Sequence, residues 1–483
     1  MTLPPRVRAL SIHADYRCRH TGVCCSSGWD IPVEPGVELH LRNALGSGTL
    51  RVPEAVISSP LPPTQARRAS SFLRPVSGFL HGARVVLATH SSGRCLFLDP
   101  DRRCAVHRQL GPEALPAACR DFPRVVTRTP LGVSITLSHY CPTAAAMLFT
   151  PVTLSDSRPP GREGSTVAIV ENPPGFPPSW PYEGLDARDA LPPLLRPGVL
   201  MDWPRLERWE TFAVTVLGDE RRSPEAALDV LAAAAEEARR WTPEDGAFEG
   251  YFERVLSSRG APSGRATRDP QCDSTPRADG GSLARNRHSD ALLMNNKARA
   301  GERRLARGDP GDASVLPCGP GARATAAQPG PSRGTGHWLK ATRVSRGSGL
   351  GMTKAWSLLA DCVPHRSLLP PPPEGLDDAD ARWVAPGWPS LALPVRRWLA
   401  AKAFASWSTL QGEGVRTTAL GLRVALRVLR AEAARGCAEA DRALDAELLK
   451  EAVRRADLLL VHLADPEGLA RRLGRCEHAP ARA

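Results

Sequence analysis

Cysteine placement is the feature that most constrains how this chain can fold. Of its 12 cysteines, seven lie before residue 142 and five are scattered over the remaining sequence. The N-terminus lacks the apolar core of a signal peptide, so we expect a cytoplasmic protein. In that reducing compartment, clustered cysteines more often bind metal or perform redox chemistry than form structural disulfides. The seven candidate metal ligands are Cys18, Cys24, Cys25, Cys95, Cys104, Cys119 and Cys141.

Thiolates are soft donors suited to zinc or to iron–sulfur clusters, and four of them complete either kind of site. The candidates come as an adjacent pair, a pair nine residues apart, and single cysteines, which is not the spacing of a zinc ribbon. Separate loops must therefore meet, and the sequence leaves open which four cysteines do so. The step Cys141-Pro142 is similar to the one that closes ferredoxin motifs, and it favours a 4Fe–4S cluster over zinc. The alternative is that several of these cysteines are small buried hydrophobic residues.

Short apolar stretches separated by glycine, proline and aspartate are typical of the first 150 residues. Asp99-Pro-Asp101 predicts a turn that folds the chain back toward Cys104. Short helices are expected over residues 104–110, ended by Gly111, and from Pro142 through Phe149. We expect strands over residues 84–89, 95–98, 125–127 and 133–137. This pattern predicts a loop-rich cysteine-cluster domain with short strands, in a chain of the α+β class.

Helical periodicity dominates the rest of the chain. Proline-rich residues 150–205 read as a connector with one strand at 166–170, and Leu206, Trp209 and Phe212 then begin a helix with one buried face. Further helices are expected over 225–241, 248–256, 395–411, 416–435 and 442–463. The sequence therefore predicts a mostly helical C-terminal region.

The excess positive charge sits mainly in one segment. Residues 257–349 carry +9 of the net charge of +12, without apolar periodicity. Such a segment cannot offset its ordering entropy by burial, so we expect a disordered, basic, low-complexity insert; translation in the wrong frame is the alternative. Trp338 alone does not make the aromatic stacking surface of a nucleic-acid binder, which argues against that partner. No apolar run reaches the ~18 residues of a membrane span, so no membrane partner is expected.

These patterns predict four parts of the chain. The expected boundaries are a metal-binding cysteine-cluster domain at 1–150, a connector and helical segment at 151–256, the basic insert at 257–350, and a helical region at 351–483.

The residues around the cysteines resemble a known family. The string Tyr16-Arg-Cys18-Arg-His-Thr-Gly-Val-Cys24-Cys25-Ser-Ser-Gly-Trp29 is similar to the opening motif of the cysteine-cluster family, a zinc- or iron-chelating family of the CxxCxxCC type. The second block, from Cys95-Leu-Phe-Leu-Asp99 to Cys141-Pro142, resembles one branch, the flagellin lysine-N-methylases. The resemblance implies an iron–sulfur cluster and transfer of a methyl group from S-adenosylmethionine to lysines of flagellin or another lysine-bearing protein. The alternative function is a non-catalytic zinc- or iron-binding structural module.

The chain departs from the family at one position. Family members carry a further cysteine between the first cysteine and the adjacent pair, and here His20 is the residue that could replace it as a ligand. The sequence also lacks a Gly-x-Gly-x-x-Gly loop after a strand, which argues against a Rossmann-type methyltransferase, so catalytic residues stay unassigned.

Polar residues beside the cysteines are candidates for supporting roles. Arg120 and Arg124 could bind a carboxylate or lower a thiolate pKa, or they could pair with local acids such as Asp121. His107 and His139 lie close in sequence to Cys104 and Cys141. Each could orient a metal ligand or carry a proton, or it could be a structural histidine.

Overall fold

The structure analysed is a computed structural model of the chain. The predicted basic insert lies outside the residues it describes, as does the helix predicted over 248–256 except at residues 248 and 250. The described residues are 6–52, 72–80, 83–150, 166–242, 244, 247, 248, 250, 351–363, 369 and 375–474.

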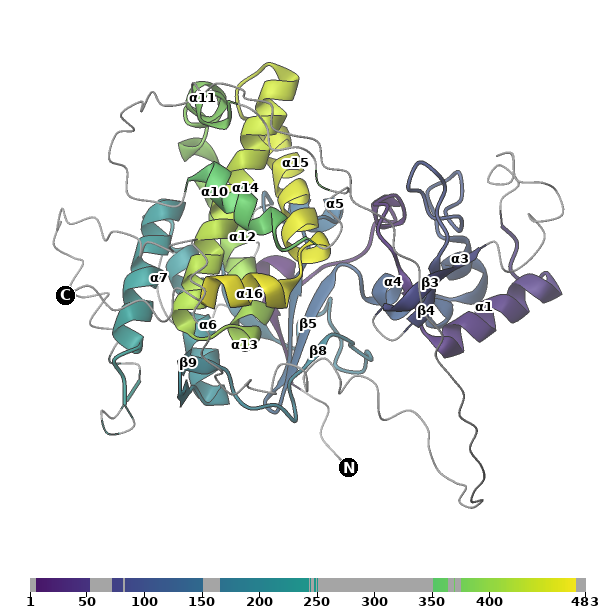
Figure 1. Cartoon of the computed structure of the whole chain (residues 1–483), viewed down its shortest axis with the longest axis horizontal. Helices are drawn as coiled ribbons and strands as arrows, with labels where there is room; N and C mark the ends of the chain where they lie inside the picture. The colour runs from purple at the N-terminus through teal and green to yellow at the C-terminus, as the bar shows by residue number, and fades with distance from the viewer. Residues whose placement is uncertain are drawn as a thin grey trace, which may run out of the picture.

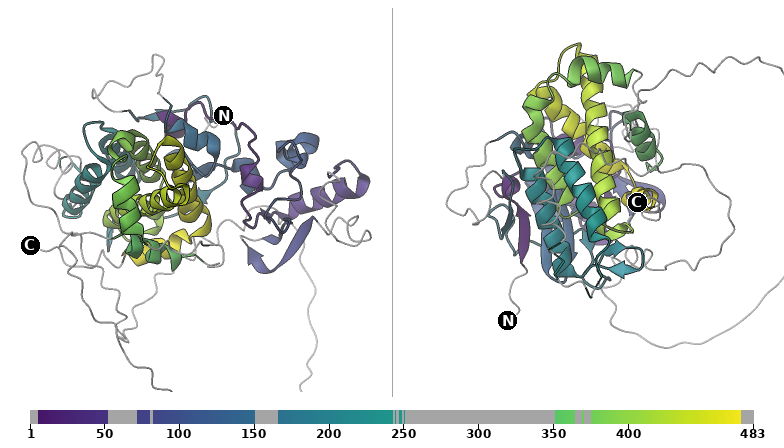
Figure 2. Two further views of the ribbon diagram at one scale, coloured as in Figure 1. Left: turned by 90° about the horizontal axis from the view of Figure 1, so that it is seen from above. Right: turned by 90° about the vertical axis from the view of Figure 1, so that its left-hand side faces the viewer.

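A large helical body and a smaller lobe make up the molecule, as Figures 1 and 2 show. The lobe contains most of the cysteine-rich segment, and the body contains a five-stranded sheet covered by helices. The predicted α+β class and the mostly helical C-terminal region are therefore confirmed. Among the described residues, no helix combines the length and the apolar character needed to cross a bilayer.

The sheet of the body is built around a hairpin of two strands, each of which the sequence predicted. Its strand order is β7-β1-β6-β5-β8, with β5 and β6 antiparallel and β1 parallel to β6. All four residues of β1 are buried, so this strand lacks the alternation that would reveal it in the sequence. The strands are β1 (Val7–Leu10), β5 (Arg124–Thr129), β6 (Gly132–Leu137), β7 (Ile169–Glu171) and β8 (Leu185–Asp186). Strands from before and after residue 150, the predicted end of the first domain, share this sheet. The four predicted domain boundaries stay predictions.

The lobe packs a small sheet against short helices. Leu41, Leu73, Val85 and Phe97 are among the buried residues of its core. Its elements are β2 (Pro32–Val33), α1 (Pro35–Ser47), β3 (Leu73–Leu80), β4 (Ala83–Leu87), α3 (Ala105–Leu110) and α4 (Ala117–Asp121), with turns η2 (Val23–Cys25) and η5 (Pro112–Ala114).

The strand predicted over residues 95–98 is wrong. Only isolated bridges join Thr89 to Cys95 and Leu98 to Cys104, because a tight turn follows at once. That turn was predicted: Asp99 N donates to Arg103 O at 2.8 Å, which reverses the chain toward Cys104.

Helices of the body bury the faces that periodicity predicted. Leu206, Trp209 and Phe212 are all buried in α6, and α14 packs against α7, α10 and α15. The body also contains the turns η1 (Ser11–His13) and η10 (Pro389–Leu391), a hairpin of β9 (Leu194–Arg196) and β10 (Val199–Leu200), and two π-turns, η9 (Asp380–Val384) and η11 (Leu458–Leu463). Its helices are α5 (Pro142–Met147), α6 (Trp203–Gly218), α7 (Pro224–Ala238), α10 (Met352–Ala360), α11 (Leu376–Ala379), α12 (Ala392–Ala403), α13 (Trp407–Gln411), α14 (Val415–Ala440), α15 (Ala446–Asp457) and α16 (Pro466–Gly474).

The helix predicted over 395–411 is interrupted where it meets the sheet. Thr136 Oγ1 donates to Ala401 O and Thr127 Oγ1 donates to Ala405 O, both at 3.0 Å. Ala405 has a φ of 55° and its backbone N–H donates to Glu210 Oε1 at 3.0 Å. Side chains of the sheet and of α6 therefore take over the hydrogen bonding at the break.

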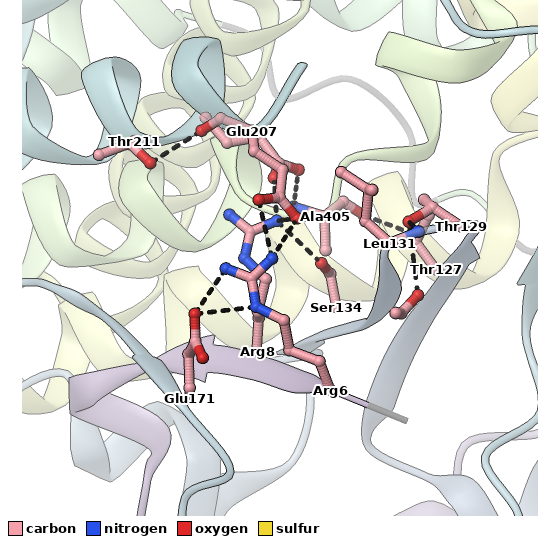
Figure 3. A network of polar contacts seen from close by, with 12 residues as sticks. Arg6, Arg8, Thr127, Thr129, Leu131, Ser134, Glu171, Glu207, Thr211 and Ala405 are labelled. Atoms are coloured by element: carbon pink, nitrogen blue, oxygen red, sulfur yellow. Dashed lines mark hydrogen bonds and ion pairs between the residues drawn. The ribbon is translucent and has the colours of Figure 1, made fainter. Parts of the chain in front are cut away.

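A buried ion-pair network joins the sheet to α6 (Figure 3). Arg8 of β1 is 4% exposed and lies 3.0 Å from carboxylate oxygens of both Glu207 and Glu210. Arg6, which is more exposed than Arg8, pairs with Glu171 and Glu207. Charges buried to this degree are stable only when they are paired, so the network fixes β1 against the helices.

Candidate metal centre

Four separate segments carry the seven candidate cysteines. They are η2 with the residues before it, the turn between β4 and α3, helix α4, and the loop that precedes α5. Each of the seven is a free cysteine. Cys95 N donates to Cys25 O at 2.7 Å, so the first and second segments are joined directly through the backbone.

Five of the thiols form a group, which we call the five-thiol group: Cys24, Cys25, Cys95, Cys104 and Cys119. Burial, together with the charges of Cys104 and Cys24, raises the pKa of Cys95 to about 12. Burial also raises the pKa of Cys119, with added contributions from Cys95, Cys104 and Cys24. The hydrogen bond between Cys24 and Cys25, whose sulfurs are 3.8 Å apart, raises the pKa of Cys25 together with burial. The charge of Cys24 thus raises the pKa of the other four thiols, whereas the hydrogen bond from Cys25 lowers the pKa of Cys24 itself.

The remaining two cysteines lie beside this group. Tyr16 Oη is 3.6 Å from Cys141 Sγ. Burial raises the pKa of Cys18, and the charges of Cys141 and Cys24 add to the effect. Cys18 is therefore near enough to be affected by the charge of Cys24, a member of the five-thiol group, and by the charge of Cys141.

His20 and His107 meet at the same site. His20 N donates to Cys18 Sγ at 3.4 Å, and His20 Nδ1 lies 4.0 Å from the same sulfur. The rings of His20 and His107 pack together with centroids 5.6 Å apart. His20 adopts a positive φ of 50°, and in this backbone conformation its N–H points toward Cys18 Sγ. The structure thus brings together two of the three histidines that the sequence singled out.

The two arginines have different surroundings. Arg120 pairs with Glu183 at 2.5 Å, so it has a local acid as its partner. Asp121, the acid expected for this role, instead accepts hydrogen bonds from Trp180 Nε1 and from Glu183 N.

Arg124 stacks among aromatic rings. Its guanidinium lies 5.4–5.8 Å from the ring centroids of Tyr16, Phe176 and Trp180. Within the described part of the chain, no carboxylate pairs with it. Its charge is therefore available next to the tyrosine that contacts Cys141.

His139 belongs to a different environment. Its backbone N–H and its Nδ1–H both donate to Asp457 Oδ2, at 2.6 and 3.2 Å, and its Nε2 lies 3.2 Å from His13 Nε2. Lys402 Nζ and Trp398 Nε1 donate to the same carboxylate at 2.8 and 2.9 Å. Burial lowers the pKa of His139, and this histidine is part of a buried network in the body.

The donor chemistry of the site fits a thiolate-bound metal. Soft donors come from separate loops, and a bound cation would favour the ionised form of those thiols whose pKa values burial and neighbouring thiols raise. As placed, no three histidine, cysteine, aspartate or glutamate side chains of the described residues converge closely enough to hold an ion. Metal binding therefore requires the cysteine loops to move closer together.

Sequence reasoning did not identify every residue of the site. Tyr16, Trp29 and Ser138 lie inside the quoted motifs, but their residue types do not reveal a role. Asp457 and His462 contact His139 and Ser138 in the loop before Cys141, and no local pattern connects them with residues more than 300 positions earlier.

Comparison with known proteins does not assign the chain to a family. No family model matches it, and neither a curated protein nor a solved structure is significantly similar to it. The resemblance to the cysteine-cluster family therefore rests on the motif residues, and function has to be argued from the site.

Proposed function

We propose that this protein binds an iron–sulfur cluster, with 4Fe–4S favoured over zinc, through thiolates of its seven-cysteine site. The observation that carries the proposal is the five-thiol group, in which loops distant in sequence gather soft donors. Cys24, Cys25, Cys95, Cys104 and Cys119 are the residues that would hold the metal, with Cys18, Cys141 and His20 as further donors beside them. The cluster would supply a redox-active or Lewis-acidic centre.

The activity that this centre would serve is methylation of protein lysines. The support is the motif resemblance to flagellin lysine-N-methylases, which implies S-adenosylmethionine as the methyl donor and flagellin or another lysine-bearing protein as the acceptor. Arg124 fits this proposal because its charge, free of a carboxylate partner among the described residues, can balance an anionic thiolate centre. A cytoplasmic location would suit a reduced cysteine site.

The alternative is a structural metal site without catalysis. It is favoured by the lobe itself, whose core is small and includes Cys95, Cys104 and Cys119 at its edge. A metal bound there would hold together loops that bury little apolar surface of their own.

Metal analysis of protein purified without oxygen tests the proposal. About four irons and four acid-labile sulfides per chain, with brown absorbance, are expected for the cluster. One zinc without sulfide or colour would support the structural site instead, and a chain without bound metal would refute both. A methylation assay on flagellin then follows only for the iron-containing protein.

Replacement of the adjacent pair identifies the ligands. The double variant Cys24→Ser, Cys25→Ser is expected to lose its metal, because hydroxyl oxygens are poor ligands for iron or zinc in such sites. Cys437→Ser is the matched control, since Cys437 is a buried free cysteine of α14. Unchanged metal content in the double variant would show that this pair supplies no ligand.

A further inference from the structure

One C-terminal helix holds three consecutive residues of the loop that carries Cys141. Arg454 Nε donates to Tyr140 O at 3.2 Å, Asp457 accepts from His139, and His462 Nε2 lies 2.7 Å from Ser138 Oγ. These contacts come from α15 and from the π-turn η11 that continues it. They are directed at the three residues immediately before the cysteine.

The π-turn explains how one helix can make all of these contacts. Residues five apart lie far from one another around a regular α-helix, which has 3.6 residues per turn. A π-turn closes hydrogen bonds between residues five apart, as from Ala464 N to Leu459 O, and therefore brings such residues onto one face. Asp457 and His462 are five apart, so the wider turn directs both toward the Cys141 loop.

His462 also contacts the segment that carries the adjacent cysteines. Its ring packs on Trp29 with centroids 4.4 Å apart, and Trp29 lies four residues after Cys25. Phe122 and Tyr140 surround the same two rings, with centroids 5.2–6.4 Å from one another or from them. One imidazole thus connects two cysteine-bearing segments.

The hydrogen bond of His462 joins its ring directly to the Cys141 loop. Ser138 Oγ accepts from Tyr140 N at 3.4 Å and lies 2.7 Å from His462 Nε2, and the tautomer of the ring sets which of the two groups donates. Burial lowers the pKa of His462 to about 4, so the imidazole is neutral at pH 7. The role of the ring therefore has two separable parts, a hydrogen-bond partner for Ser138 and a flat surface for Trp29.

We propose that His462 is a positioning residue of the cysteine site, which fixes the Cys141 loop relative to the segment of Cys24 and Cys25. This inference rests on the proposed metal-binding function and adds to it a role for the C-terminal helices. Residues that orient metal ligands without touching the metal typically contribute 10–100-fold to metal affinity.

Titration of the metal-free full-length protein with Co²⁺, followed by the thiolate-to-cobalt absorption band, measures this role. His462→Phe keeps a flat ring against Trp29 but cannot form the hydrogen bond with Ser138, and it is expected to bind Co²⁺ about tenfold more weakly than wild type, with an altered band. His462→Gln places an amide oxygen near the position of Nε2 and is expected to recover most of the affinity. Ser138→Ala removes the same hydrogen bond from the other side and should match His462→Phe.

Two controls separate positioning from general stability. His40→Gln changes an exposed histidine of α1 and should leave binding unchanged. Leu429→Ala removes a buried side chain of α14, far in sequence from every cysteine loop, and is expected to lower the melting temperature while Co²⁺ affinity stays within twofold.

The failures can be told apart. Wild-type Co²⁺ affinity and spectrum in both His462→Phe and Ser138→Ala would overturn the positioning role alone. An equal loss of affinity in Leu429→Ala would also overturn it, because the effect would then follow stability. A wild-type protein that binds neither iron, zinc nor Co²⁺ would overturn the proposed function, and this inference with it.

Discussion

At the scale of the residue, the two arginines beside Cys119 show how much depends on the partner. Arg120 is paired with Glu183, whereas Arg124 lies among three aromatic rings, one of which belongs to Tyr16, the contact of Cys141. The sequence could not distinguish them, because the rings and the acid come from residues 16, 176, 180 and 183, which only the fold brings near. The sequence left open whether the arginines near Cys119 pair with local acids. Among the described residues, the tertiary structure shows that Arg120 has a carboxylate partner and that Arg124 has none.

Arg124 is therefore expected to matter more for metal binding than Arg120. Arg124→Gln removes a positive charge next to an anionic centre and should weaken Co²⁺ binding about tenfold, which corresponds to ~1.4 kcal/mol of lost attraction. Arg120→Gln is the matched control, because its charge is already paired and its loss should change affinity less than twofold. Equal effects of the two substitutions in the same titration would contradict this assignment.

At the scale of the element, contacts between the sheet and the helices account for both the correct and the wrong predictions. Helix α6 was predicted because Leu206, Trp209 and Phe212 repeat at the spacing of one helix face. The break between α12 and α13 was not predicted, because it depends on hydroxyl groups of Thr127 and Thr136 in the sheet. Strand β6 was predicted from its β-branched run although Val133–Leu137 are buried, whereas the four residues of β1 include Arg8 and offer no such run. Local patterns thus predict an element well only when its own residues supply a clear periodic or β-branched run.

The ion pairs of β1 permit a comparison within one network. Glu210→Ala removes one of the two carboxylates that lie 3.0 Å from the buried Arg8 and also removes the acceptor of Ala405 N, so it is expected to lower the free energy of unfolding by about 1–3 kcal/mol. Glu171→Ala breaks the exposed pair with Arg6 and should cost less than about 1 kcal/mol. Urea unfolding of both variants measures the difference. Similar costs for the two would show that burial does not set the value of these pairs.

At the scale of the whole molecule, the site joins parts of the chain that sequence analysis treated separately. Clustered cysteines predicted that loops would meet in a metal site, and this stays a prediction, because no three potential ligands converge among the described residues. The contribution of α15 and η11 could not be predicted, because His462 and Asp457 lie in an ordinary amphipathic stretch. Their partners are more than 300 residues away, and only the packing of the body against the cysteine loops reveals them.

Neutral histidines buried between these parts should make the molecule sensitive to acid. Burial lowers the pKa of His13 and His462, the latter to about 4; the charge of Lys402 lowers both further, and that of Asp457 opposes the shift. Between about pH 6.5, where histidines of the unfolded chain take up protons, and pH 4, the unfolded state binds more protons than the folded state. Stability is therefore unaffected by these groups above that window and falls with decreasing pH inside it, by at most about 1.4 kcal/mol per pH unit for each histidine.

Urea unfolding at pH 7.5, 6.0 and 5.0 checks this expectation. Wild type should lose stability toward pH 5.0, and His462→Gln, which cannot titrate at this position, should show a shallower dependence. Parallel curves for the two proteins would mean that His462 does not contribute to acid sensitivity.

The contacts of α15 and η11 with the Cys141 loop also have a consequence for the order of chain synthesis and metal binding. The ribosome synthesises all seven N-terminal cysteines before it synthesises residues 454–462. A nascent chain interrupted in that interval would carry every thiol but none of the three side chains that hold residues 138–140. Premature loading of metal onto loosely held loops, or oxidation of their thiols, would then compete with correct assembly until the last helices are made.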